Sequence, residues 1–307
     1  MQLPWSPSAA AILAAALCGA ASGQSPRLTI DLDGPASRAV TVAIEGRVVV
    51  RAPDEGLFAV SLRMDGGRPV DWRYGKPTER SESNGWTLIA GEIALADGVL
   101  KVRDAYKVEG EFVRGIRRYE WRGAKPLEDC TLAVRFVVPG AGRARPFLPG
   151  ISYFGNPAGA ANGGRTAIQA GAPGEESYYE EHRYPMPFAC VEHDGVVAAL
   201  HTVPSAPIGA RRPDLWWSLG VSAGAADAEL GSRSGAVASN GRHGVVKALQ
   251  SGFMDYPDAS VTLRPGVVIE KTFALQVAAI EPGFGFAACV RAAVRDRRPY
   301  STDGLPS

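Results

Sequence analysis

The stretch WTLIAGEIALADGVLKVRDAYKVEGEFVRGIRRYEW, residues 86–121, decides the fold class. It contains three runs rich in β-branched and aromatic residues, separated by the turn sequences Ala96-Asp97-Gly98 and Gly110-Glu111. Runs of this kind joined by tight turns are typical of antiparallel hairpins. The stretch therefore predicts three consecutive strands, over residues 86–95, 99–110 and 111–121.

The same pattern extends in both directions along the chain. More than a dozen short strand-like runs occur without intervening helices, internal repeats or a low-complexity linker. We therefore predict an all-β fold, a large antiparallel β-supersandwich. Alternation places Val70, Trp72 and Tyr74 on one strand face, and Trp72, Trp86 and Trp121 are expected in the core. The other predicted strands cover residues 28–32, 39–44, 47–52, 57–64, 69–76, 127–140, 188–204 (a hairpin), 214–221, 244–254, 259–266 and 267–280.

The two ends of the chain depart from the strand pattern. Residues 1–23 resemble an export signal, because an apolar run too short to span a bilayer precedes small residues suited to cleavage. Residues 283–297 have apolar side chains at helical spacing, and Pro299 would end that helix. We predict a signal peptide (1–23), a sandwich domain (24–282) and a C-terminal linker-type helix and tail (283–307). The protein is expected to be secreted or periplasmic, without a membrane span.

Charge and cysteine content narrow the function classes. The formal net charge is +1, without a basic block, which argues against a nucleic-acid partner because phosphate binding needs clustered Lys and Arg. Beyond the signal, Cys130, Cys190 and Cys289 lie far apart and lack zinc-ligand spacing. We predict no metal site and no cofactor. The three cysteines are either buried small side chains or, in an oxidising compartment, one disulfide and one free thiol.

The order of elements resembles a known family. Two strands with LRPG between them, followed by a helix ending near a proline (residues 263–299), resemble the end of the N-terminal β-supersandwich of bacterial carbohydrate-active enzymes, which is similar in fold to galactose mutarotases. The run PFLPGISYFGN, residues 146–156, is similar to PG-x-x-Y-x-G-N loops of bacterial glycosidase-like proteins. The resemblance implies a following (α/α) toroid that carries most catalytic groups. The chain reaches Ser307 about where that toroid would begin, so we expect either an N-terminal part of a longer protein or a free-standing sandwich.

Residues 147–188 hold the candidate site, a polar and aromatic groove for sugar. The ring of Tyr153 can stack on a pyranose, and the Asn156 amide can bind vicinal hydroxyls. The alternative for this loop is a Tyr that only covers the sheet edge. If residues 176–184 are extended, they place two carboxylates, an imidazole and two phenols on one face; these are Glu176, Tyr178, Glu180, His182 and Tyr184.

That face suits general acid–base chemistry on sugars. Glu180 and His182 are the candidate catalytic pair, and Tyr178, Arg183 and Tyr184 are candidates for substrate binding. The alternative is a solvated charged edge in which Arg183 pairs locally. Trp216 and Trp217 are adjacent and face opposite ways on a predicted strand. One is expected in the core, and the other, for which we take Trp217, is a candidate stacking platform.

Three function hypotheses follow. The first is an exported carbohydrate-binding or carbohydrate-active protein, the sandwich of a glycoside hydrolase-like enzyme acting on oligo- or polysaccharide, whose partner domain is a helical toroid. The second is a self-contained mutarotase- or epimerase-like enzyme that uses a Glu with His182, His193 or His201. The third is a non-catalytic interaction module of the cell envelope, which predicts an exposed apolar patch.

Overall fold

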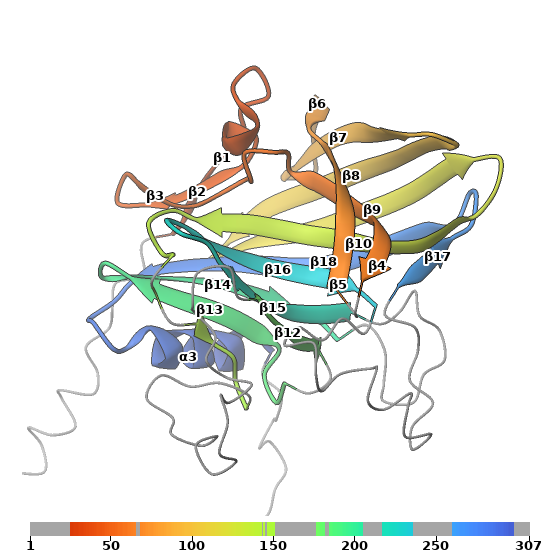
Figure 1. Cartoon of the computed structure of the whole chain (residues 1–307). Helices are drawn as coiled ribbons and strands as arrows, with labels where there is room; N and C mark the ends of the chain where they lie inside the picture. Colours follow the sequence, from red (N-terminus) through yellow and green to blue (C-terminus); the bar gives the residue numbers. More distant parts are fainter. Residues whose placement is uncertain are drawn as a thin grey trace, which may run out of the picture.

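Two large sheets make up the body of the protein. The computed structural model describes residues 25–65, 68–142, 144, 146–150, 176–181, 184–204, 217–235 and 260–297. Within these residues the strands form a ten-stranded sheet, sheet A, and an eight-stranded sheet, sheet B, and every strand pairing is antiparallel (Figure 1). The predicted all-β sandwich is thereby confirmed.

Sheet A has the path β1-β2-β3-β10-β16-β15-β12; β17 and β4 also pair with β10, and β5 pairs with β4. Sheet B has the order β11-β13-β14-β18-β9-β8-β7-β6. The strands of sheet A are β1 (Arg27–Thr29), β2 (Thr41–Ile44), β3 (Arg47–Arg51), β4 (Phe58–Asp65), β5 (Arg68–Gly75), β10 (Leu127–Val138), β12 (Glu176–Glu180), β15 (Trp217–Ala223), β16 (Ala228–Ser234) and β17 (Val261–Leu263). Those of sheet B are β6 (Pro77–Ser83), β7 (Trp86–Leu95), β8 (Gly98–Glu109), β9 (Phe112–Gly123), β11 (Pro146–Phe147), β13 (Phe188–His193), β14 (Val196–Thr202) and β18 (Val268–Ala279).

The stretch of residues 86–121 forms the three strands that the sequence predicts. β7, β8 and β9 pair consecutively in sheet B, and Gly110 takes a φ of 59° in the turn between β8 and β9. This left-handed conformation suits glycine because a side chain would be strained there. Three strands, β6, β11 and β16, were not predicted. β11 has only two residues. The sequences of β6 and β16, PTERSES and AELGSRS, carry little β-branched content, so pairing with neighbouring strands decides their conformation. The predicted strand 244–254 lies outside the described residues.

Alternating side chains fill the space between the sheets. Leu132, Val134 and Phe136 of β10 are fully buried there, as expected for alternate residues on one face of a strand. Phe136 and Tyr106 both pack against Phe273 of β18, with ring centroids 5.6 and 6.1 Å apart. The core therefore joins the central strands of both sheets, which holds sheet A rigid behind its outer face.

Two ion pairs are buried inside the sandwich. The Arg117 guanidinium of β9 donates to both oxygens of Asp104, at 2.8 and 2.7 Å, and also to the carbonyls of Leu57 and Ala133. The Lys271 ammonium of β18 donates to the Glu181 carboxylate at 2.7 Å. Burial lowers the pKa of Lys271. Since each pair bridges backbone or side chains from both sheets, the pairs fix how the sheets face each other.

The predicted C-terminal helix is α3 (Gly285–Arg297), which packs on the face of sheet B that points away from sheet A, next to β13 and β14 (Figure 1). The Glu192 carboxylate accepts hydrogen bonds from the backbone N–H groups of Gly283 and Gly285. A carboxylate at this end satisfies free donors of the first helical turn. A short 3-10 helix, η1 (Ala36–Arg38), precedes β2. Within the described residues, no helix combines the length and apolarity that crossing a bilayer requires.

Candidate functional site

The outer face of sheet A, which points away from sheet B, carries a row of aligned positions across four strands. Tyr178 of β12 pairs with Gly220 of β15. Gly220 pairs with Gly231 of β16, which in turn pairs with Arg135 of β10. Because aligned residues point to the same side of a sheet, two missing side chains leave a slot in the middle of this row.

Tyr178 fills that slot. A Cβ atom at Gly231 would lie 2.2 Å from the Tyr178 hydroxyl oxygen, and one at Gly220 would lie 1.9 Å from the Ser177 carbonyl oxygen. Both positions therefore need glycine for steric reasons. Tyr178 is fully buried, and this burial raises the pKa of its phenol to about 12. The phenol stays neutral at ordinary pH.

The guanidinium of Arg233, on β16, lies over the Tyr178 ring, 3.9 Å from its centroid. It donates to both carboxylate oxygens of Glu176, at 3.0 and 2.7 Å. The side chain of Arg233 is 4% exposed and that of Glu176 29%. Two parallel hydrogen bonds hold the guanidinium in one orientation. The packing on Tyr178 adds a cation–π contact.

A second arginine repeats this arrangement beside the first. Arg135 of β10 donates to Glu229 of β16 at 2.9 and 2.6 Å. Its guanidinium lies 5.9 Å from the ring centroid of Trp72 and 5.2 Å from that of Tyr74, both on β5. The Arg233 guanidinium lies 5.5 Å from the same Trp72 ring. We name this set the arginine–aromatic platform: Trp72, Tyr74, Arg135, Glu176, Tyr178, Glu229 and Arg233.

The platform combines guanidinium groups with aromatic ring faces. Arg135 Nη1 and Arg233 Nε are buried and have no hydrogen-bond partner within the described part of the chain. Buried donors without partners are uncommon in folded proteins and cost about 1–3 kcal/mol each. Trp72 is half-buried and Tyr74 is 36% exposed. Such a surface fits a ligand whose oxygen atoms accept hydrogen bonds and whose apolar face packs on an aromatic ring.

Two of the residues singled out from the sequence, Tyr178 and Glu180, lie on this outer face, and both are fully buried. Their predicted shared face with Glu176 is confirmed by the register of β12 with β15. Glu180 aligns with Ser218, whose other neighbour is Arg233. Tyr153, Asn156, His182 and Arg183 lie outside the described residues, so their assigned roles stay predictions.

The remaining two residues singled out from the sequence, Tyr184 and Trp217, point into the sandwich. Tyr184 is 5% exposed and donates its hydroxyl to the Leu219 carbonyl at 2.6 Å, so its predicted place on one face with Tyr178 and Glu180 is wrong. Trp217 is 2% exposed, with its ring centroid 6.4 Å from that of Tyr119. Trp217 thus takes the core position of the Trp216/Trp217 pair. A ring wedged between the sheets is closed to stacking by a ligand, which corrects the assignment of Trp217 as a platform.

The expectation that Trp72 belongs to the core is also corrected. Trp72 pairs with Ser61 and lies on the outer face of sheet A, whereas Trp121 is buried as predicted. The predicted alternation of Val70, Trp72 and Tyr74 is right, but alternation alone does not say which face is the core. The sequence contains one signal that could have pointed to Arg135. It is the one charged residue in the largely apolar run TLAVRFVV (residues 131–138).

The histidines in the described residues lie elsewhere. His201 is 4% exposed, is hydrogen-bonded to Gln276 at 2.8 Å and packs against Phe112 and Phe188 in sheet B. His193 is at the end of β13, 3.1 Å from the Asp194 carboxylate. Neither contributes to the platform. Among the described residues there is also no group of three or more His, Cys, Asp or Glu side chains that could hold a metal ion.

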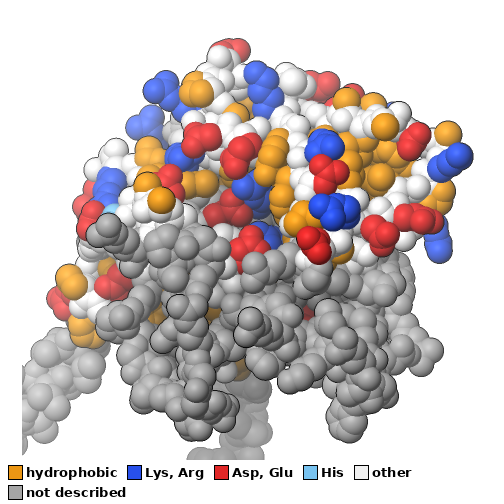
Figure 2. All heavy atoms as spheres, viewed as in Figure 1, with side chains coloured by type: hydrophobic (Ala, Val, Ile, Leu, Met, Phe, Trp, Pro, Cys, Tyr) orange, Lys and Arg blue, Asp and Glu red, His pale blue; other side chains and the backbone are white. Residues whose placement is uncertain are grey.

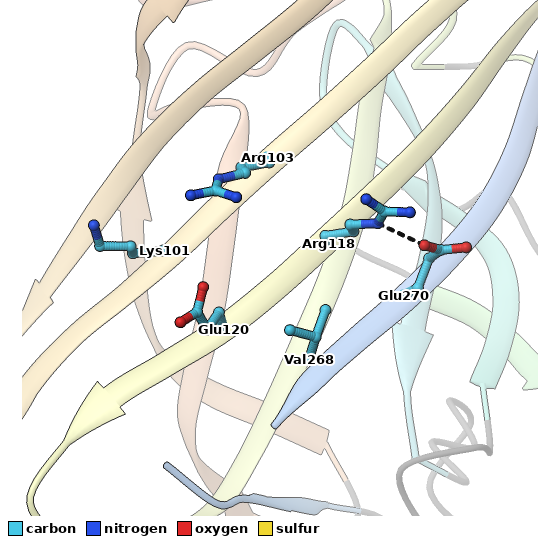
Figure 3. Close-up of a pocket in the computed structure, with 6 residues that line it drawn as sticks. All are labelled: Lys101, Arg103, Arg118, Glu120, Val268 and Glu270. Carbon is cyan, nitrogen blue, oxygen red and sulfur yellow. Dashed lines mark hydrogen bonds and ion pairs between the residues drawn. The ribbon is translucent and has the colours of Figure 1, made fainter. Parts of the chain in front are cut away.

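The outer face of sheet B offers a different surface. In the part of this face that α3 does not cover, side chains of β8, β9 and β18 line a shallow hollow (Figure 3). The Arg118 guanidinium pairs with Glu270 at 2.6 Å, and these side chains are 60% and 42% exposed. Acidic and basic side chains are similarly interspersed over the described surface in Figure 2. The charged side chains that line this hollow are solvated surface ion pairs of the ordinary kind.

Comparisons with known proteins concern the fold. No protein-family model and no curated protein matches the chain. Among solved structures, the chain is similar to a candidate aldose 1-epimerase from Escherichia coli K12, with 13% identity, a TM-score of 0.48, and coverage of 83% of this chain and 97% of that one. It is also similar to a galactose mutarotase related enzyme from Lactobacillus acidophilus (7% identity, TM-score 0.43, coverage 84% and 96%).

A third similar structure is a galactose mutarotase-like protein from Clostridium acetobutylicum (8% identity, TM-score 0.41, coverage 84% and 100%). Two of these three proteins are described by reference to galactose mutarotase, and the other is described as a candidate aldose 1-epimerase. At such identities the likeness concerns the course of the sandwich alone, so the roles of residues rest on this chain's own geometry.

Proposed function

We propose that the protein binds carbohydrate on the arginine–aromatic platform of sheet A. The supporting observation is the placement of two paired guanidinium groups around one half-buried ring. Arg135 and Arg233 both lie within 6 Å of the Trp72 ring centroid, and a carboxylate holds each of them in place. Sugars present hydroxyl and ring oxygens on their edges and C–H groups on their faces, which matches donors beside a ring.

The carboxylates of the platform complete this proposal. Glu176 and Glu229 hold the two guanidinium groups in fixed orientations, and their remaining lone pairs can accept hydrogen bonds from hydroxyls. A rigid sheet supplies these groups without a loop having to order, so little entropy is lost on binding. The wider function that we infer is that of an exported carbohydrate-active protein, glycoside hydrolase-like if it is an enzyme.

A comparison of two tryptophan variants tests the proposal. A glycan array with the intact protein would first identify a bound oligosaccharide. Titration calorimetry with that oligosaccharide would then compare Trp72→Ala with Trp86→Ala. Trp86 is a matched control because it is also half-buried and has a cation beside its ring, with the Lys107 Nζ atom 6.0 Å from the ring centroid. It belongs to sheet B, away from the platform.

We expect Trp72→Ala to weaken binding about five- to tenfold, since stacking on an aromatic ring contributes about 1–1.5 kcal/mol. Trp86→Ala should leave the affinity within about twofold. If both variants bind like the parent, the platform is not the binding surface. If no glycan is retained by a protein with an intact circular dichroism spectrum, carbohydrate binding itself is wrong.

A further inference from the structure

Helix α3 and strand β13 each bring one cysteine to the same place. Cys289 is on α3 and Cys190 on β13, and both side chains are fully buried. They belong to one apolar cluster on the outer face of sheet B. The remaining members of that cluster with high burial are Phe147, Phe188, Val197, Ala199 and Ala293.

The docking of α3 brings the two thiols together. The Gly285 N–H donates to the Glu192 carboxylate at 2.9 Å, which fixes the start of α3 over the end of β13. Cys289 lies four residues further along the helix, about 6 Å. Cys190 lies two residues back along the strand, about 7 Å, and on the same face as Glu192.

Aromatic contacts agree with this alignment. Phe286, one turn before Cys289, packs on Phe147 and Phe188, with both ring centroids 5.8 Å from its own. Phe147 is the residue that pairs with Cys190 across β11 and β13. Burial, followed by the neighbouring Cys190 thiol, raises the pKa of Cys289 well above its ordinary value. Both thiols are fully buried, so they are shielded from reagents while the helix is docked.

Cys130 lies in another part of the molecule. It is on β10 in sheet A, within the cluster between the sheets, and its thiol donates to the Val261 carbonyl at 3.1 Å. It shares no apolar cluster with the other two cysteines. Of the three possible pairings among these residues, only one joins neighbouring side chains.

We propose that Cys190 and Cys289 form a disulfide that fastens α3 to sheet B, and that Cys130 remains a thiol. The oxidant is a disulfide-exchanging compound such as glutathione disulfide or a thiol oxidoreductase. One cysteine thiolate attacks the oxidant's disulfide and releases one thiolate, giving a mixed disulfide. The second cysteine then attacks the mixed disulfide and releases the other thiolate, so that two cysteine protons and two electrons leave the protein. Because the docked thiols are buried, the reaction takes place during folding or while α3 is detached.

Refolding in a glutathione redox buffer tests this pairing. The full chain, which has four cysteines, is unfolded in urea with reductant, refolded in the buffer, alkylated and mapped by mass spectrometry. We expect a Cys190–Cys289 cross-link, with Cys130 alkylated. Four alkylated cysteines, or a cross-link that includes Cys130, would overturn the proposal.

A stability measurement gives an independent readout. The cross-link closes a loop of about 100 residues, so the urea midpoint should rise by about 1 M on oxidation. Cys130→Ser should keep that rise, whereas a Cys190→Ser, Cys289→Ser double variant should lose it. The proposal is wrong if the reduced and oxidised parent have equal midpoints, or if the double variant retains the shift.

Discussion

The outer faces of the two sheets carry the same kinds of charged residue in opposite settings. On sheet B, Arg118 and Glu270 form an ion pair with side chains 60% and 42% exposed. On sheet A, Arg233 and Glu176 form a two-point pair with side chains 4% and 29% exposed, and an aromatic ring packs under the guanidinium. Sequence composition does not separate these pairs, but their surroundings do.

The difference indicates which face has a use beyond solubility. An exposed pair costs little to form and contributes about 0–1 kcal/mol. A buried pair has a large desolvation cost, and apolar residues would often be as stable in its place. Folding alone therefore does not explain the buried ion pairs on sheet A. Their presence supports a candidate site on the outer face of that sheet.

The largest expected effect comes from breaking one pair on each face. Arg233→Met removes the guanidinium but keeps much of its volume, and it leaves the Glu176 carboxylate without that partner. We expect a loss of about 3 kcal/mol in the free energy of unfolding. Arg118→Met, the matched change on sheet B, should cost less than about 0.5 kcal/mol. Urea denaturation of both variants measures the difference.

A double variant checks the cause. Adding Glu176→Gln to Arg233→Met removes the carboxylate charge that has lost its arginine, and this should restore part of the lost stability. Equal losses for Arg233→Met and Arg118→Met would show that the two faces do not differ as described.

The next effect concerns the glycine slot under Tyr178. Gly231→Ala places a Cβ atom 2.2 Å from the Tyr178 hydroxyl oxygen, so the ring must shift from its present position against Arg233. We expect a loss of about 2 kcal/mol, measured by urea denaturation. Tyr178→Phe removes the clashing oxygen, so a Gly231→Ala, Tyr178→Phe double variant should be more stable than the sum of the single changes predicts. Strict additivity would contradict the clash.

The smallest effect is a pH dependence of the same residue. Burial raises the pKa of Tyr178 to about 12 in the folded protein, whereas an unfolded tyrosine ionises near 10. Between these values the folded state binds more protons than the unfolded state. The stabilisation is therefore complete below pH 10 and is lost as pH rises toward 12.

At pH 11 this loss should be about 1 kcal/mol for Tyr178. Thermal unfolding of the parent and of Tyr178→Phe at pH 8 to 11 isolates it, because other buried tyrosines contribute equally to both proteins. The gap between their stabilities should change with pH only above 10. A constant gap would mean that the phenol ionises as freely in the fold as in the unfolded chain.

Local sequence patterns predicted most of the strands. The hairpins of residues 86–121 are confirmed because β-branched runs and glycine turns specify them without help from distant residues. β16 was missed because AELGSRS has no local preference for a strand. It becomes one because β10 and β15 pair with its two edges.

The candidate site could be predicted only in part. Glu176, Tyr178 and Glu180 were placed on one face by alternation, and the register confirms this. Trp72, Arg135 and Arg233 come from strands far apart in sequence, so their meeting depends on strand order. Trp217 was assigned to the wrong side, since two adjacent tryptophans must face opposite ways and the sequence does not say which one is inside.

The sequence by itself determined the antiparallel sandwich, its turns and its final helix, because side-chain periodicity and turn chemistry act over a few residues. Tertiary structure alone decided which face of each strand is the core, which arginines lose their water, and which cysteines become neighbours. Those outcomes depend on contacts between segments that are distant along the chain, and no local pattern encodes the partner across the sheet.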